Sequence, residues 1–276
     1  MSSALRVAEI WIYPVKSCHG ISLEASELLP TGLRWDRHWM IVRPDGSMLT
    51  QREKPQMARL LLSLKNDQIS MQTPSGLIEL AMKPGVRPER TRKVRVWNDD
   101  VEAGVEPDAR LHAYLSDVVG EPVELVGVAQ GFHRQVTESK VLLDQPVRFA
   151  DQQPLMIATR ASLRELNNRM DEEIPIHRFR PNLVLEDESG AAFAEDGWSA
   201  IQLPGARIEI RQRVARCPIT TIDQDEGRKI SAEPLKTLAG FRRDKNKVYF
   251  GVHAFSKEGG HVSVGDGVRA FGVGSL

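Results

Sequence analysis

The chain of 276 residues contains only two cysteines, Cys18 and Cys217. Two thiols so far apart in the sequence are too few for a disulfide scaffold or a cysteine-rich metal cluster. A disulfide framework and a structural zinc site built from paired cysteines are therefore excluded. The sparse use of cysteine is typical of a protein from a reducing compartment, and we expect a cytoplasmic location.

An excess of charge of either sign is also missing, because 37 Lys and Arg are balanced by 37 Asp and Glu. Sequence-independent binding of nucleic acid needs a broad positive field, so we expect no nucleic-acid partner. No apolar run reaches the roughly 18 residues that a membrane helix needs. The first residues show neither a signal-peptide pattern nor an amphipathic leader, and we expect no membrane association.

Several catalytic and cofactor-binding motifs are missing as well. The sequence has no phosphate-binding P-loop, no G-x-S-x-G and no H-E-x-x-H. Gly265-Asp266-Gly267 follows a predicted strand but opens no helix, which excludes a dinucleotide-binding motif there. The acidic segment 223–227 lacks the register of a calcium loop and predicts a solvated turn.

Short segments of β-like composition dominate what is present, and they predict a mainly β fold with some α, arranged as barrels. Apolar residues at helical spacing predict a helix over 107–119 and another after Thr159, a candidate N-cap. Pro234 is suited to a first helical position and predicts a short third helix. We predict strands at 7–13, 39–42, 58–64, 69–72, 77–81, 94–97, 182–185, 201–203, 208–211, 220–222, 248–250 and 262–264.

A polar stretch with little periodicity runs over residues 129–148. Such a stretch indicates a domain boundary or a long functional loop. We therefore predict two domains, at residues 1–128 and 129–276, each built mainly from β-strands.

Cys217 is the first candidate functional residue. By residue type alone, a cysteine beside a strand in such a protein is most often a small buried apolar side chain. Arg216 precedes it and Pro218 follows, and basic neighbours favour the thiolate that binds soft metals. A single thiolate is too few for structural zinc but suits a metal that arrives with ligands of its own. Neighbouring strand residues point in opposite directions, so Arg216 need not face the sulfur.

Three groups of cations and donors could meet an anionic ligand. Arg178, Arg180 and Asn182 would share one face of an extended segment and fit a phosphate-bearing ligand. Lys16 and Ser17 follow a strand-ending proline, where donors gather at a strand end. An exposed charged face is an equally good interpretation of the arginines. The third group is a cationic segment between two tryptophans, made of Arg34, Asp36, Arg37 and His38.

Taken together and in order, these segments resemble the MOSC proteins, named after the C-terminal domain of molybdenum cofactor sulfurase. The group that contains the mitochondrial amidoxime-reducing component and its bacterial relatives is more similar still. The N-terminal half is similar to the β-barrel domain that precedes the MOSC domain in that family. The segments that carry the resemblance are 12–18, 35–39, 178–182, 193–198, 216–217, 220–221, 233–238 and 264–266.

This resemblance implies an N-terminal β-barrel domain over 1–128 and a MOSC β-barrel domain over 129–276. It also implies a molybdenum cofactor, in which a phosphorylated pterin (molybdopterin) holds the metal through its dithiolene. The family's metal-ligating and catalytic cysteine falls on Cys217. Its cofactor-binding positions fall on Lys16, Ser17, Arg37, Thr159, Arg180 and Asn182. Pyridoxal phosphate binding is attributed to MOSC proteins only generically.

The implied activity is the reduction of N-hydroxylated compounds, such as amidoximes and hydroxylamines, by a molybdenum-dependent oxidoreductase. No cysteines remain after Cys217 for an iron–sulfur domain, so electrons are expected from a separate reductase, ferredoxin or cytochrome-type protein. Relatives often have a further cysteine where this chain has Val214, and Gln-Tyr where it has Val252-His253. Two alternatives stay open: a non-catalytic carrier of the cofactor or of sulfur, and a transferase that uses Cys217 as nucleophile.

Overall fold

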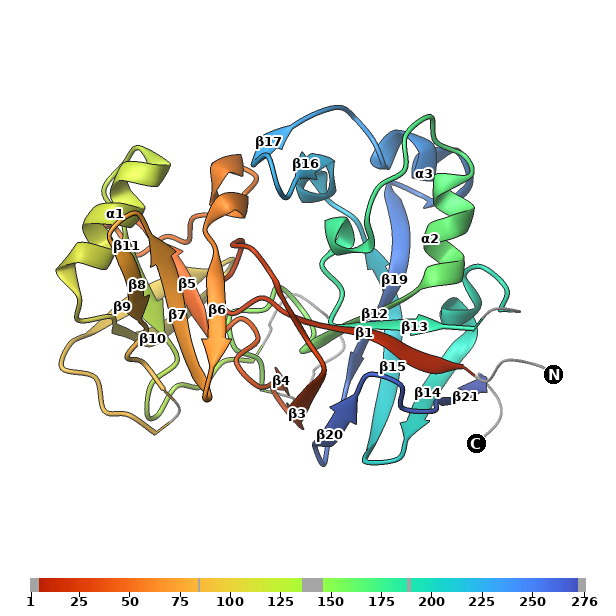
Figure 1. Ribbon diagram of the computed structural model, residues 1–276, viewed down its shortest axis with the longest axis horizontal. Helices are drawn as coiled ribbons and strands as arrows, with labels where there is room; N and C mark the ends of the chain where they lie inside the picture. The colour runs from red at the N-terminus through yellow and green to blue at the C-terminus, as the bar shows by residue number, and fades with distance from the viewer. Residues whose placement is uncertain (1–4, 84, 136–145, 188–189, 273–276) are drawn as a thin grey trace.

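The computed structural model describes residues 5–83, 85–135, 146–187 and 190–272, in two halves that lie side by side (Figure 1). Strands dominate both halves and helices are few. The predicted mainly β fold with some α, in two β-rich parts, is thereby confirmed.

The second half is built on the largest sheet, which has nine strands among the described residues. Its order is β2-β1-β13-β12-β19-β15-β14-β21, with β18 paired to β19, and β12 and β13 are its parallel pair. β1 and β2, from the start of the chain, therefore belong to a sheet that lies mainly beyond the predicted domain boundary at residue 128. The strands are β1 (Arg6–Ile12), β2 (Ile21–Leu23), β12 (Leu155–Thr159), β13 (Leu183–Glu186), β14 (Trp198–Leu203), β15 (Ala206–Ala215), β18 (Arg243–Asp244), β19 (Lys247–Phe255) and β21 (Arg269–Gly272).

The first half combines two antiparallel sheets with one helix. α1 (Ala109–Val119) is capped by Asp108, whose carboxylate accepts from Arg110 N, and it ends at Gly120, where φ is 74°. An aspartate at the N-cap and a left-handed glycine after the last turn are common helix ends, so the sequence itself marks both ends of α1. One sheet contains β5 (Trp39–Val42), β9 (Thr91–Val96), β10 (Asp99–Val105) and β11 (Glu124–Gly127), and the other β6 (Leu62–Lys65), β7 (Gln68–Thr73) and β8 (Gly76–Glu79).

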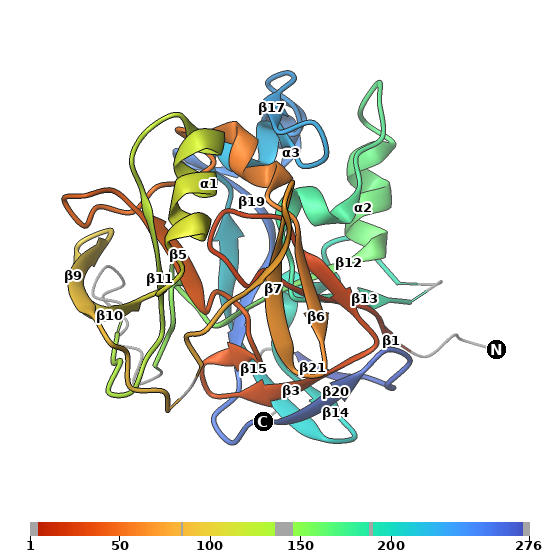
Figure 2. The ribbon, with the colours of Figure 1, turned by 60° about the vertical axis from the view of Figure 1, so that its left-hand side comes forward.

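Smaller sheets join the halves. β3 (Ala25–Leu29) pairs with β4 (Gly32–Leu33) and also with β20 (Gly260–Ser263), beside which it lies in Figure 2. β16 (Ile222–Asp223) and β17 (Arg228–Lys229) form a hairpin. Its turn is the acidic segment 223–227, in which Asp223 accepts from the N–H groups of Asp225 and Glu226, so the predicted turn is confirmed. Among the described residues, the remaining α-helices are α2 (Arg160–Asn167) and α3 (Leu235–Phe241).

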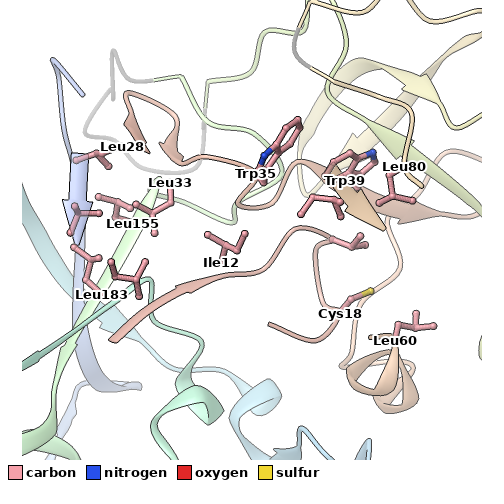
Figure 3. Packing of buried hydrophobic residues seen from close by; sticks show 14 of the residues in the cluster. Ile12, Cys18, Leu28, Leu33, Trp35, Trp39, Leu60, Leu80, Leu155 and Leu183 are labelled. Carbon is pink, nitrogen blue, oxygen red and sulfur yellow. The ribbon is translucent and has the colours of Figure 1, made fainter. Parts of the chain in front are cut away.

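One hydrophobic core runs through both halves. Figure 3 shows Trp39 and Leu60 of the first half in the same cluster as Leu155 and Leu183 of the second. Cys18 is fully buried in this cluster. Because the halves share a core, side chains from both can be held in fixed positions at the cavity between them.

Most predicted strands are confirmed, and two are wrong in part. The start of 58–64 belongs to a 3-10 helix, Pro55–Arg59, and that of 220–222 to another, Pro218–Thr221. Both begin at a proline, which lacks the N–H that a strand ladder needs but fits a first helical position. β12 was not predicted, because all its residues are buried and no alternation marks it. Of the stretch 129–148, residues 136–145 lie outside the described residues.

Candidate functional site

A cavity of about 280 Å³ lies between the two halves. Its ionisable lining is strongly positive, since five cations face a single carboxylate, that of Asp151. The positive charge is local, because the whole chain is formally neutral. A cavity of this charge suits an anionic ligand such as a phosphate. The five cations are Lys16, Arg37, Arg52, Arg180 and Arg216.

The structure brings six of the seven predicted site residues together on this cavity. The exception is Thr159, which does not line it. Thr159 caps α2, as predicted, by accepting from Ser162 N, and its hydroxyl also donates to the buried carboxylate of Glu195 at 3.1 Å. The six that line the cavity are Lys16, Ser17, Arg37, Arg180, Asn182 and Cys217.

Cys217 lies where β15 has ended and the 3-10 helix of Pro218–Thr221 begins. Its side chain is partly exposed and opens onto the cavity. Cys18 is the opposite case, because burial raises the pKa of its thiol to about 12, although Arg180 acts to lower it. Cys18 thus fits the interpretation as a buried apolar side chain, whereas Cys217 is accessible from the cavity.

Four of the cavity residues hold the left-handed backbone conformation that favours glycine. The φ angles are 67° at Ser17, 45° at Arg37, 57° at Trp97 and 57° at Arg180. Such angles cost about 1–3 kcal/mol each for residues other than glycine. The surrounding packing must compensate for this cost, and clustered strain of this kind is characteristic of binding sites.

Arg180 is almost completely buried, yet part of its guanidinium is free. Its Nη1 donates to Cys18 O at 2.8 Å and to Gln224 at 3.2 Å, whereas Nη2 has no partner among the described residues. Burial lowers the pKa of Arg180 to about 10. A buried donor without a partner is costly, and an anionic ligand in the cavity would satisfy it.

Arg37 is held by a neighbouring acid. Its Nη1 donates to both carboxylate oxygens of Asp36, at 2.7 and 2.6 Å, and Nη2 donates to Arg180 O at 3.2 Å. Asp36 is itself buried and accepts from Tyr13 N at 2.8 Å. The side chain of Arg37 is therefore hydrogen-bonded to the backbone of Arg180 without a ligand.

Arg216 is a cavity residue that the sequence left undecided. Its Nη2 donates to Phe179 O at 2.8 Å, and its buried Nε has no partner among the described residues. Burial lowers the pKa of Arg216 to about 10, and the neighbouring Cys217 acts in the opposite direction. Because β15 has already ended at Ala215, strict alternation no longer separates Arg216 from Cys217, and both line the cavity.

Lys16 reaches the cavity from the first half. Its ammonium donates to Phe149 O at 2.8 Å and pairs with Asp151. Burial lowers the pKa of Lys16, whereas the pairing with Asp151 raises it. Asp151 also accepts from Trp97 Nε1 at 3.0 Å, and Arg52 lies 4.3 Å from the centroid of the Trp97 ring. Sequence reasoning missed these last three residues, which no local motif marks.

The side-chain amide of Asn182 is hydrogen-bonded to backbone groups. Its Oδ1 accepts from Met156 N at 3.1 Å and its Nδ2 donates to Trp11 O at 3.1 Å. The amide therefore ties β12 to β1 at the edge of the cavity. Asn182 shapes the cavity wall, and its side-chain oxygen and one of its two N–H donors are already used.

Two expectations about cations are wrong. Arg178 does not share a face with Arg180, because Ile176–Phe179 forms a 3-10 helix instead of an extended segment. Arg178 pairs with Asp223 at 2.7 Å away from the cavity lining. His38 is not part of a cationic segment either, since burial, with Arg148 as a smaller cause, lowers its pKa to about 3.

Both departures from the family pattern fall on the cavity. Val214 and His253 line it together with Cys217. Burial, followed by the charge of Arg216, lowers the pKa of His253 to about 4, so its ring is neutral at pH 7. Its Nδ1 is buried and has no partner among the described residues. This chain therefore presents a neutral imidazole to the cavity.

The arrangement suits a metal that brings most of its own ligands. Across the part of the chain that the structure describes, no three His, Cys, Asp or Glu side chains come together in a group that could hold a metal ion. Cys217 alone can supply one soft thiolate ligand. Unpartnered donors on Arg180 and Arg216, which line the same cavity as that thiol, fit a metal carried by a phosphorylated organic ligand.

Comparisons with known proteins identify both parts of the chain. Residues 4–122 match the MOSC N-terminal beta barrel domain, and residues 144–269 match the MOSC domain. Mitochondrial amidoxime reducing component 2 of Bos taurus is 31% identical, over 95% of this chain and 82% of that protein. Mitochondrial amidoxime-reducing component 1 of Homo sapiens is 28% identical, over 96% of this chain and 83% of that protein.

A third relative is the molybdenum cofactor sulfurase of Oryza sativa subsp. japonica, which is 30% identical over 91% of this chain but only 32% of that protein. The chain belongs to the MOSC protein family, with the N-terminal MOSC barrel and the MOSC domain in sequence. These relatives point to a function associated with the molybdenum cofactor. None of the described helices combines the length and apolar character needed to span a bilayer.

Proposed function

We propose that the cavity binds a molybdenum cofactor and that the thiolate of Cys217 is the protein's ligand to the metal. The observation that carries this proposal is the position of the thiol. Cys217 opens onto a cavity lined by five cations and one carboxylate, with free donors on two buried guanidiniums. One cavity thus offers a thiolate that can bind a metal and cationic donors that can bind a phosphate.

The residues of this chain would hold the cofactor at its two ends. Arg180, Arg37 and Lys16 supply the positive charge and donors for the phosphate-bearing part. Ser17 and Asn182 shape the wall between the halves, and Arg216 lies beside the thiol. Thr159 is left out of this set, because its hydroxyl is used in capping α2.

The proposed activity is the reduction of N-hydroxylated compounds, as the names of the relatives suggest. An amidoxime takes up two electrons and two protons, its N–O bond breaks, and an amidine and water are released. Bound in the cavity, the cofactor would supply the two-electron redox centre for this change. The electrons come from a separate electron-transfer protein of ferredoxin or cytochrome type. We expect the protein to act in the cytoplasm.

Replacement of the thiol tests the assignment. Protein made in a host that synthesises the cofactor should contain molybdenum and pterin, and should reduce benzamidoxime when an artificial reductant is supplied. Cys217→Ser should lose at least ~100-fold in turnover, because the metal loses its soft ligand, while pterin remains bound through the cations. A serine variant with the wild-type rate overturns the ligand assignment.

A second pair of variants tests the phosphate-binding role. Arg180→Ala should lose most of its pterin, measured as fluorescence of the oxidised pterin released from purified protein. The matched control is Arg59→Ala, an exposed arginine outside the cavity lining, which should keep it. Equal retention by both variants contradicts the role of Arg180. Full cofactor loading without any turnover in the wild type would favour the carrier alternative over the reductase.

A further inference from the structure

Three arginines of the nine-stranded sheet are stacked on aromatic rings and exposed to solvent. The guanidinium carbon of Arg211 lies 4.4 Å from the centroid of the Phe255 ring. Those of Arg207 and Arg269 lie 5.2 Å from the centroid of the Phe271 ring. None of the three has a carboxylate partner among the described residues. We call these three residues the arginine face.

The acidic residues close to this face do not neutralise it. Glu209 lies 3.6 Å from Lys257, and Asp244 pairs with Arg213 at 2.9 Å. β14, the strand between β15 and β21, carries no charged side chain. Glu258, in the turn after β19, is a further exposed carboxylate among the described residues. Three unpaired guanidiniums therefore outweigh one carboxylate on a chain with no net charge.

Arg211 stands at a β-bulge of the sheet. Between β15 and β19, Ile210 pairs with Ala254 and Gln212 with His253, so Arg211 is the additional residue. Bulges of this kind change the direction of a side chain and are frequent near active sites. The guanidinium of Arg211 lies over the ring of Phe255, on the neighbouring strand β19.

The arginine face is continuous with the cavity along β19. Phe255 is two residues from His253, so both side chains lie on the same face of the strand, about 7 Å apart. His253 lines the cavity that holds Cys217. A protein bound over Arg211 would therefore lie next to the wall of the cavity. In Figure 1, β14, β15 and β21 lie together on the side of the second half that carries β20.

We propose that the arginine face is the docking site for an acidic electron-transfer protein. This inference rests on the proposed reductase function, which requires electrons from another protein. The charge of the face selects a partner with a negative surface, because complementary charge steers and orients the encounter. Stacking on aromatic rings restrains the guanidiniums before binding, which lowers the entropy cost of forming the complex.

A binding measurement tests the docking site without requiring turnover. The probe is an acidic plant-type [2Fe–2S] ferredoxin, titrated by calorimetry into the cofactor-loaded protein at low ionic strength. Arg211→Glu should raise Kd about tenfold or more, and added salt should weaken binding to the wild type. The matched control is Arg87→Glu, which makes the same charge change at an exposed arginine of the first half.

Three results would overturn the docking site. They are the lack of measurable ferredoxin binding, an equal rise of Kd in Arg211→Glu and Arg87→Glu, or equal binding of a basic cytochrome c. Kinetics separate this failure from that of the proposed function. In Arg211→Glu the benzamidoxime rate driven by reduced ferredoxin should fall relative to the rate driven by reduced methyl viologen. A wild type that binds ferredoxin but reduces nothing with either donor refutes the reductase function and leaves the docking site supported.

Discussion

The guanidinium carbon of Arg180 lies 4.1 Å from the centroid of the Tyr13 ring. Arg37 lies 4.4 Å from the same ring, so one aromatic side chain contacts two cations. The negative faces of the ring offset part of the repulsion between the two guanidiniums. Tyr13 therefore keeps the cationic wall of the cavity in place, although it does not line the cavity itself.

Substitutions at Tyr13 separate its ring from its hydroxyl. Tyr13→Leu should lower the free energy of unfolding by about 2–4 kcal/mol, because both cation–π contacts and ring volume are lost. Tyr13→Phe should stay within about 1 kcal/mol of the wild type, since the buried hydroxyl has no partner among the described residues. Urea denaturation measures both. A Phe variant as unstable as the Leu variant would show that the hydroxyl makes a stabilising hydrogen bond.

The two cysteines should differ in reactivity. In cofactor-free protein, iodoacetamide at pH 8 should modify Cys217, which is partly exposed, and leave Cys18 intact. Burial raises the pKa of Cys18 to about 12, so it is neither accessible nor ionised. Peptide mass spectrometry gives the site of modification. Cofactor loading should protect Cys217, and denaturation should expose Cys18. Modification of Cys18 in the folded protein would contradict the buried position.

His38 should make the protein less stable in acid. Its ring packs in edge geometry against Trp35 and Trp39, with centroids 5.2 and 4.5 Å away, and burial lowers its pKa to about 3. Below pH 6.5 the unfolded chain binds a proton there that the folded protein does not, so stability falls as the pH falls toward 3. The contribution reaches about 1.4 kcal/mol per pH unit.

His38→Phe should therefore show a shallower loss of unfolding free energy between pH 6.5 and 4 than the wild type does. Denaturant titrations at several pH values measure the slope, which does not depend on the absolute stability of the variant. His261→Gln, at an exposed histidine, serves as control and should keep the wild-type slope. A slope that is unchanged in His38→Phe would mean that His38 is protonated in the folded protein.

The sequence predicts a strand well where turn residues bound it. Turns bound β5 and β7, which are confirmed nearly residue by residue. β12 was missed because its residues are all buried, which removes the alternation that marks a strand, and because it runs directly into α2 without a turn to mark its end. The first strands also join a sheet formed mostly by the last hundred residues, and local periodicity holds no information on such distant pairing.

The candidate site was predicted only in part, because sequence motifs are local. Cys217, Arg180 and Lys16 belong to short motifs in which the resemblance to a family can be recognised. Asp151 and Trp97 come from different halves and meet only because the chain folds back. The interpretation of Arg178 failed because alternation was assumed over a segment that is a 3-10 helix followed by a left-handed residue.

Thr159 provides a last test, because its predicted role at the cofactor and its observed role in α2 lead to different outcomes. Thr159→Ala should lower the free energy of unfolding by about 1–2 kcal/mol, since the hydroxyl accepts from Ser162 N and donates to buried Glu195. Pterin content should equal that of the wild type, because the side chain does not line the cavity. Denaturation and pterin fluorescence are measured on the same preparation, with Thr159→Ser as the variant that keeps the hydroxyl. Loss of pterin at unchanged stability would instead return Thr159 to the cofactor-binding set.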